Sequence, residues 1–136
     1  MVAGLDRAAH GGRTLPLAVW PAGLAGFAGA MIVSARAMAV NPFFEGTVRI
    51  QRDAGQRVVD AGPYRRVRHP GYLGLAGWAL ASPLLLLSAR ALAPAVVTAA
   101  WGVLRTALED AVLRRELEGY REYARRVRWR LVPGIW

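Results

Sequence analysis

The sequence predicts an all-α integral membrane protein with about three transmembrane spans, the last two forming a helical hairpin, plus a C-terminal amphipathic interfacial helix. Three apolar segments support this fold class: residues 15–40, 72–89 and 91–108. Strongly charged segments lie between or after them, so the mean hydropathy is +0.24 although 20% of the residues are charged. Apolar segments of this length joined by charged connectors are typical of helices that cross a bilayer.

The first apolar segment, residues 15–40, is interrupted only by Ser34 and Arg36. At a rise of about 1.5 Å per residue, this length is ample to cross a hydrocarbon core of about 30 Å. Small residues recur at every fourth position in two series, Ala22-Gly26-Ala30 and Ala25-Gly29. Because such spacing lets helices approach closely in lipid, we expect this span to pack against a neighbouring helix.

Residues 1–14 are polar and Gly-rich, and we expect them to form a flexible N-terminus. Residues 15–136 are predicted to form one domain, with a span over 15–40, a connector over 41–71, a hairpin over 72–108 and a C-terminal segment over 109–136. A cleavable signal peptide ending near Ala37-Met38-Ala39 is the alternative for the first span. The apolar stretch is longer than the usual core of about 7–15 residues, which favours a span.

The second and third apolar segments are separated only by Arg90, which predicts a tight helical hairpin. After the hairpin, apolar residues recur at helical spacing, at Leu104, Leu108, Leu113, Leu117 and Tyr120. This periodicity predicts an amphipathic helix that leaves the third span along the membrane surface. Gly119 is expected to mark a break in that helix.

The distribution of Arg predicts the topology. The connector over 45–70 carries six Arg and the segment from Arg105 carries eight, whereas the N-terminus has two and the hairpin turn has one. Basic loops stay in the cytoplasm, so both Arg-rich segments should face it and meet on the side where soluble cofactors are available. The protein is therefore expected to be integral to a membrane and in contact with its lipids, with both Arg-rich segments at the cytoplasmic face.

The composition excludes several classes of site. The chain has no Cys, which rules out disulfides, thiolate metal sites and thiol nucleophiles, and its two His are too few for a His-rich zinc site. No metal is therefore expected. The net charge of +9 would also suit nucleic acid, but long apolar segments separate the Arg-rich ones, so the membrane is favoured and no nucleic-acid partner is expected.

Two groups of residues could carry chemistry. The first is the segment 62–74, GPYRRVRHPGYLG, where the connector enters the second span. Its Arg residues could serve only as anchors at the cytoplasmic boundary and its Tyr residues only as an aromatic belt. The second group is Arg105 with Glu109 and Asp110, where the i,i+4 spacing places Arg105 and Glu109 on one helix face. An ion pair that ends the span is the structural explanation, whereas charges this close to the bilayer favour function.

These two groups together resemble the isoprenylcysteine carboxyl methyltransferase family and, more broadly, the membrane phospholipid methyltransferases. The family has an RHPxY element, a helical hairpin, and then an acidic pair followed by a GxxYxxY-like segment. The matching residues here are Arg68-His69-Pro70-Gly71-Tyr72, then Glu109-Asp110, then Gly119-Tyr120 with Tyr123. The resemblance covers residues 41–136, and the connector over 41–59 looks like the bacterial branch, which implies the bacterial cytoplasmic (inner) membrane as the location.

The resemblance implies a cytoplasm-facing pocket for S-adenosylmethionine that the C-terminal segment closes. Carried over by position, Glu109 would complete the cofactor pocket and Arg105 would hold the acceptor substrate, which makes these two the expected catalytic residues. The other cofactor-binding residues would be Gln51, Gln56, Arg57, Val58, Val59, Tyr64, His69, Pro70, Gly71 and Tyr72.

The chemistry leaves two enzymatic alternatives. A carboxylate acceptor is already nucleophilic at neutral pH, so its O-methylation needs no general base, and Arg105 can orient it bidentately. The alternative, N-methylation of a phospholipid amine, needs a base such as Glu109, Asp110 or His69. The first is favoured, with a lipophilic or lipidated molecule as acceptor. A third hypothesis, from another class, is a non-catalytic membrane protein that binds anionic lipid.

The sequence departs from the family at two points. The second acid is Asp110, where relatives often have Glu, and one span precedes the connector, where relatives usually have further helices. The substrate tunnel is then partial, open to lipid, or completed by a second copy in a homo-oligomer.

Overall fold

The fold is all-helical in the part of the chain that the structure describes. The computed structural model describes residues 3–5, 8, 14–45, 50 and 53–136, and none of them lies in a strand. The helices, in chain order, are the 3-10 helix η1 (Leu17–Val19), α2 (Trp20–Val40), the 3-10 helix η2 (Gly62–Arg65), α3 (Pro70–Leu85), α4 (Leu92–Glu116) and α5 (Tyr120–Arg126). The predicted fold class is confirmed in its helical character.

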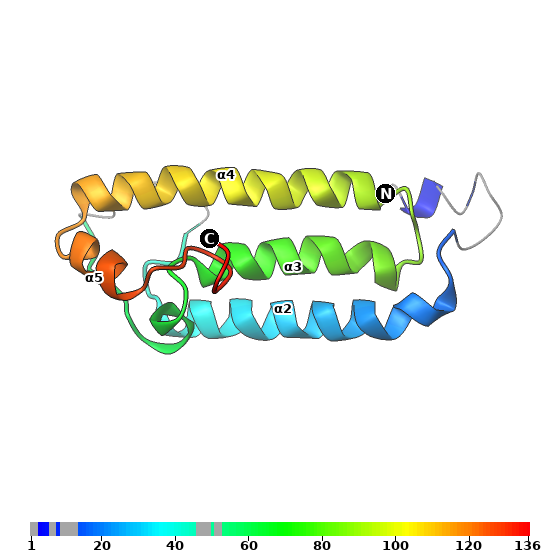
Figure 1. The fold of residues 1–136 in the computed structure, drawn as a ribbon, viewed down its shortest axis with the longest axis horizontal. Coiled ribbons are helices and arrows are strands. Elements are labelled where there is room, and N and C mark those ends of the chain that lie inside the picture. The colour runs from blue at the N-terminus through cyan, green and yellow to red at the C-terminus, as the bar shows by residue number, and fades with distance from the viewer. Residues whose placement is uncertain (1–2, 6–7, 9–13, 46–49, 51–52) are drawn as a thin grey trace.

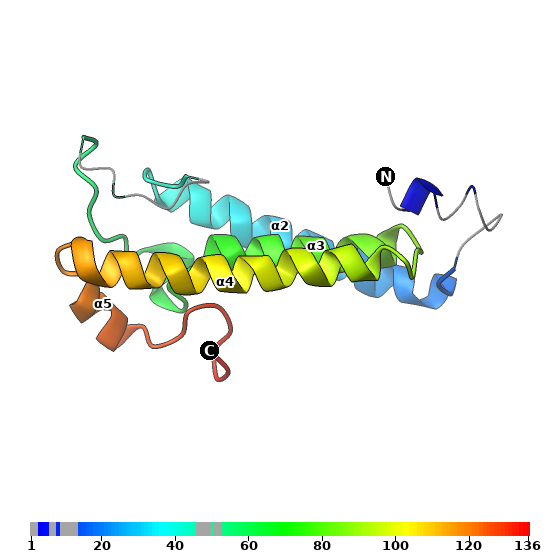
Figure 2. The same cartoon turned by 90° about the horizontal axis from the view of Figure 1, so that it is seen from above.

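The three long helices form one layer with α3 in the middle (Figure 1). Helix α3 packs along α2 on one side and along α4 on the other, whereas α2 and α4 have little or no mutual contact. Helix α5 and the connector gather at one end of the layer, and the turn between α3 and α4 lies at the other (Figures 1 and 2). The two Arg-rich segments therefore meet at one end, as predicted, while Arg90 lies in the turn at the opposite end.

The turn after α3 confirms the predicted hairpin and ends α3 with a defined hydrogen-bond pattern. The N–H of Ser88 donates to the carbonyl oxygen of Pro83 (3.0 Å) and that of Leu87 donates to Leu84 (3.2 Å). These are the two bonds of a Schellman motif, which needs a left-handed residue at its centre. Leu87 takes that place with φ 52°, and its carbonyl oxygen accepts N–H bonds from Thr14 and Leu15.

Among the described residues, one helical stretch, Leu17–Val40, is long and apolar enough by itself to cross a membrane. Helix α3 has 16 residues, about 24 Å at the usual rise, and the second half of α4 carries charged residues. Large apolar side chains nevertheless point outward along all three helices, among them Leu24, Ile32, Leu80, Val97 and Leu104. Exposed apolar side chains along all three helices are typical of contact with lipid. The number of spans, like the predicted domain boundaries, stays a prediction.

The long amphipathic helix predicted after the third span is divided. Helix α4 continues to Glu116, and Gly119, with φ 76°, breaks the chain before the short helix α5. The predicted break is confirmed, because a left-handed residue cannot continue a helix. Tyr120 and Tyr123 of α5 are buried against Leu113 and Leu117, so this face packs on protein. An interfacial role for the segment stays a prediction.

The contact between α2 and α3 depends on small residues, but on fewer than the sequence patterns indicated. Gly23 and Ala30 are buried in α2, whereas Ala25 and Gly29 are exposed. A Cβ at Gly23 would lie 2.8 Å from the Cβ of Leu84 and 2.9 Å from the backbone nitrogen of the next residue. A Cβ at Gly29 would meet nothing within 4 Å. Ala22 and Gly26 are exposed as well, so Ala30 is the one member of the two predicted series that is buried, and Gly23 belongs to neither series.

Gly23 and Gly29 therefore provide a matched pair of substitutions in one helix. Gly23→Ala should destabilise the protein by about 1–3 kcal/mol, because the new methyl group must displace the backbone of α3. Gly29→Ala should be neutral or stabilise by up to about 1 kcal/mol through helix propensity. Unfolding in mixed detergent micelles, followed by circular dichroism, measures both. Equal effects of the two substitutions would contradict this packing of α2.

Candidate active site

The site begins where Pro70 starts helix α3. Proline is favoured in the first turn of a helix, because its φ is already helical and its missing N–H has no partner there. Pro70 accordingly is the first residue of α3, with His69 as the preceding cap residue. Tyr72, two residues later, then lies in the first turn of the helix. The RHPxY element thus fixes the start of a helix and the direction of its side chains.

Residues 127–130, which follow α5, are held to the RHPxY element by backbone and side-chain hydrogen bonds. The N–H groups of Arg68 and His69 donate to the carbonyl oxygens of Trp129 and Arg130, at 2.9 Å each. Nη1 of Arg68 donates to the carbonyl oxygens of Val127 (2.8 Å) and Arg128 (2.7 Å). Four carbonyl groups that follow α5 are therefore satisfied by two neighbouring residues of the connector.

Asp110 is the buried centre of this end of the molecule. Its side chain is only 1% exposed, and it forms a two-point ion pair with Arg68, at 2.7 Å to Nε and 3.2 Å to Nη2. The same carboxylate accepts hydrogen bonds from Arg114 (2.8 Å), Arg130 (3.1 Å) and the Tyr120 hydroxyl (3.0 Å). One carboxylate therefore connects the connector, α4, α5 and Arg130, which follows α5.

The charge on Asp110 is stabilised despite its burial. Burial alone would raise the pKa of this carboxyl group, but hydrogen bonds from His69, Arg68, Arg114 and Arg130 hold the pKa far below its usual range. The lowered pKa stabilises the folded state above the unfolded pKa of about 3.9, and this stability is lost as the pH falls below it. Burial beside this carboxylate raises the pKa of the Tyr120 hydroxyl, which stays protonated and donates.

A cavity of about 620 Å³ opens beside this cluster, between the connector and helices α2, α3 and α4. Toward the ends of the helices it is lined by polar and aromatic side chains such as Gln56, Tyr64 and His69. Farther along α3 and α4 the lining becomes apolar, with Leu75 and Trp101. The cavity therefore has the amphipathic character of a site for one polar ligand and one lipophilic ligand.

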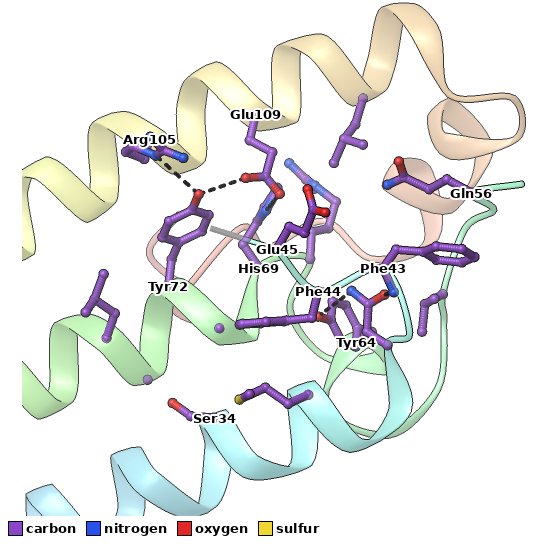
Figure 3. Close-up of a pocket in the computed structure, with 18 of the residues that line it drawn as sticks. Ser34, Phe43, Phe44, Glu45, Gln56, Tyr64, His69, Tyr72, Arg105 and Glu109 are labelled. Atoms are coloured by element: carbon purple, nitrogen blue, oxygen red, sulfur yellow. Dashed lines mark hydrogen bonds and ion pairs between the residues drawn. The ribbon is translucent and has the colours of Figure 1, made fainter. Parts of the chain in front are cut away.

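The Tyr72 hydroxyl lies between the two parts of the cavity (Figure 3). It donates to Oε2 of Glu109 (2.8 Å) and accepts from Nε of Arg105 (3.4 Å). Arg105 and Glu109, which share one face of α4, are thus joined through the Tyr72 side chain of α3. The carboxylate faces the polar part of the cavity, and the guanidinium lies one turn closer to the apolar part.

His69 is oriented by Asp110 and faces Glu109. Its Nε2 lies 3.4 Å from Oδ1 of Asp110 and 3.2 Å from the Tyr120 hydroxyl, and its Nδ1 lies 3.8 Å from Oε1 of Glu109. A proton on Nε2 satisfies the buried side of the ring and leaves Nδ1 as an acceptor. Nδ1 and the Glu109 carboxylate then form a pair of acceptors, which suits a ligand that carries hydrogen-bond donors.

The structure brings most of the predicted site residues together around the cavity. Among the described residues, those that line it are Gln56, Arg57, Val58, Val59, Tyr64, His69, Gly71, Tyr72, Arg105 and Glu109. Pro70 is fully buried and does not line the cavity. Gln51 lies outside the described residues. Their roles in binding stay predictions.

Several cavity residues were missed by the sequence analysis. They come from α2 and the segment after it: Met31, Ser34, Met38, Asn41, Phe43, Phe44 and Glu45. The available signal was Asn41-Pro42, because the residue before a proline leaves the helical conformation. Asn41 is extended at the end of α2, and its Nδ2 donates to the Tyr64 hydroxyl at 2.9 Å.

Asp110 and Asp60 offer a matched test of the buried cluster. Asp110→Asn should destabilise the fold by about 3–5 kcal/mol, because the buried Arg68 guanidinium loses its counter-charge. Asp60→Asn removes an exposed partner of Arg126 and should cost less than about 1 kcal/mol. Denaturant unfolding in micelles measures the difference. Equal stability of the two variants would show that the cluster is not a major support of the fold.

Comparison with known proteins identifies the family. A model of the isoprenylcysteine carboxyl methyltransferase (ICMT) family matches residues 24–115, about two thirds of the chain. No curated protein sequence matches significantly. The fold is similar to the solved structure of a eukaryotic intramembrane Ras methyltransferase, ICMT, with a TM-score of 0.74 and 20% sequence identity. That match covers 86% of this chain but 43% of the other, so this chain spans less than half the length of that relative. The match over residues 24–115 shows that the chain belongs to the isoprenylcysteine carboxyl methyltransferase family.

Proposed function

We propose that this protein is an S-adenosylmethionine-dependent methyltransferase that O-methylates the carboxylate of a lipophilic acceptor. Membership of the family supports a methyltransferase and disfavours a non-catalytic lipid-binding protein. The observation that carries the proposal is the hydrogen-bonded series Glu109–Tyr72–Arg105 at the boundary between the polar and apolar parts of one cavity. It supports a role for Arg105 in binding an anion, beside a site where Glu109 would bind a donor-rich, positively charged ligand.

The residues of the polar part fit S-adenosylmethionine. This cofactor supplies an electrophilic methyl group on a positively charged sulfur, and it also carries an ammonium, a carboxylate and two ribose hydroxyls. Glu109 and Nδ1 of His69 are acceptors that suit its donors. Arg57 can pair with its carboxylate, and the ring of Tyr64 can face the sulfonium. A Cβ at Gly71 would lie 2.5 Å from the Phe44 ring, so glycine keeps this part of the lining compact.

The residues near the apolar part fit an acceptor with an anionic head and an apolar tail. The Arg105 guanidinium can bind a carboxylate and orient its oxygen, and its bond to the Tyr72 hydroxyl limits the direction in which it points. The apolar tail would lie along Leu75, Trp78 and Trp101. A carboxylate needs no base, so catalysis consists of positioning and the exclusion of water. The acceptor carboxylate would approach the polar part from the bilayer side.

We propose the cytoplasmic face of the inner membrane as the location of the site. Both Arg-rich segments lie at the end of the layer that holds the cavity, and basic segments stay in the cytoplasm. S-adenosylmethionine is made and kept in the cytoplasm, so this orientation gives the site access to it. The family is one of integral membrane proteins, and Leu17–Val40 has the length and hydropathy of a span.

The first test is binding of the cofactor alone. Detergent-purified protein titrated with S-adenosylmethionine in a calorimeter should show saturable binding at one site. Glu109→Gln should weaken it by about 10–100-fold, as expected for the loss of a hydrogen bond to a charged group. Glu118→Gln, an exposed acid beyond the end of α4, is the control and should bind as the wild type does. The absence of saturable binding to the wild type would refute the proposal.

The second test identifies the methylated group and the role of Arg105. With labelled cofactor and an S-prenylated cysteine or a lipid extract, mild base should release the label as methanol, as from a methyl ester. Arg105→Ala should raise the acceptor KM by about tenfold or more with cofactor affinity within twofold of wild type, and Arg105→Lys should restore part of the loss. Arg90→Ala, at the opposite end of the layer, is the control. Base-stable label would instead indicate N-methylation.

A further inference from the structure

The last five residues, Val132-Pro133-Gly134-Ile135-Trp136, form an exposed apolar turn that the proposed chemistry does not use. We call them the C-terminal tip. Ile135 is 79% exposed and Val132 is 37% exposed, as is Trp129 just before the tip. Exposed apolar side chains on a turn are unfavourable in water, above all that of Ile135, which the described part of the chain leaves largely uncovered. An apolar partner would remove this surface from water.

The tip has a defined conformation. The N–H groups of Ile135 and Trp136 both donate to the carbonyl oxygen of Val132 (3.1 Å each), and Gly134 has the positive φ, 82°, that the turn needs. The carbonyl oxygen of Trp136 accepts from the N–H groups of Arg130 (2.9 Å) and Leu131 (3.1 Å). The turn is closed on its own base, and it holds its apolar side chains outward.

The base of the tip is connected to the buried cluster. Leu131 is 5% exposed, and the Arg130 guanidinium lies 4.8 Å from the Trp136 ring while its Nε donates to Asp110. A cation above an aromatic ring adds to this contact. Arg130 thus contacts both the Trp136 ring of the tip and the Asp110 carboxylate beside the cavity.

Charge and position identify the partner as a phospholipid bilayer. The segment 121–130 carries five Arg against one acid, Glu122, and Arg125, Arg126 and Arg128 are exposed. In both views of the fold, α5 lies at the end of the layer, whereas the C-terminus lies nearer the middle, level with the start of α3 (Figures 1 and 2). Arg at the level of phosphates, with Trp and aliphatic side chains deeper, is the arrangement of a segment in the membrane interface.

We propose that the C-terminal tip inserts into the headgroup–acyl boundary of the leaflet that faces the active site, with Arg125 and Arg128 on lipid phosphates. Insertion removes Ile135 and Val132 from water and continues the lipid-facing surface of the helices. The bilayer thereby holds the segment that carries the four carbonyl groups bound by Arg68 and His69. The proposal depends on the membrane location of the protein but on no step of the proposed chemistry.

The absence of Cys makes a clean test possible by single labelling. Ile135→Cys carries an environment-sensitive fluorophore in phosphatidylcholine vesicles that contain nitroxide lipids, labelled at the headgroup, at a shallow or at a deep acyl position. Two controls bracket it: Glu118→Cys, exposed at the break before α5, and Val97→Cys, 68% exposed on α4. Val132→Cys repeats the measurement if the label at position 135 disturbs the turn.

The expected result is strongest quenching of the Ile135 label by the headgroup and shallow nitroxides, about threefold or more above the Glu118 label, with little quenching by aqueous iodide. The Val97 label should respond most to the deep nitroxide. If the labels at positions 135 and 132 respond to iodide as the Glu118 label does, the tip lies in water and the proposal is wrong. This readout reports position only, so cofactor titration of the same variants tests the methyltransferase proposal separately.

Discussion

The ion pair between Arg68 and Asp110 is the interaction on which the architecture of the site depends. It joins the connector to α4 across 42 positions of the chain, with both side chains almost completely buried. A buried charge is tolerable only when its partners satisfy it fully, and here further Arg side chains and a Tyr hydroxyl do so. The same guanidinium holds the carbonyl groups of the C-terminal segment. The connector, the end of α4 and the residues after α5 are therefore joined by one hydrogen-bond network.

The two acids of the Glu109-Asp110 pair have different tasks because they point to different sides of α4. Glu109 reaches Tyr72 and the cavity, whereas Asp110 points into the cluster of Arg side chains. The shorter Asp side chain suits the contact with the Arg cluster. The long Arg68 side chain extends to α4, so the carboxylate at position 110 can stay close to its helix. The departure from the acid found in relatives thus bears on structure at this position more than on the cofactor.

Long, regular features were predictable from the sequence. The hairpin, the break at Gly119 and the meeting of the Arg-rich segments follow from apolar length, a helix breaker and charge. Neighbouring motif residues such as His69 and Tyr72 were also placed correctly beside Glu109, because the hairpin returns the chain to the same end. These inferences use only local spacing and the direction of the chain.

Features that depend on which faces of the helices pack together could not be predicted from the sequence. Helix α2 has many small residues, and the direction in which the helix is turned toward α3 decides that Gly23 and Ala30 are buried while Gly29 is exposed. The contribution of Asn41 and Phe44 to the cavity likewise depends on where the chain turns after α2. The position of Asp110 at the centre of a buried ion-pair cluster could not be predicted either, because its partners come from distant parts of the chain.

The single layer of helices has a consequence for molecular recognition. Since α2 and α4 have little or no mutual contact, neither helix covers α3 from the front, and in the proposed membrane location lipid would lie along it. The hydrocarbon tail of the proposed acceptor would move from lipid to Leu75 and Trp101, which are also apolar, so the hydrophobic effect would contribute almost no binding free energy. Discrimination between ligands must then come from their polar ends, which makes such a site tolerant of tail length and strict about the head.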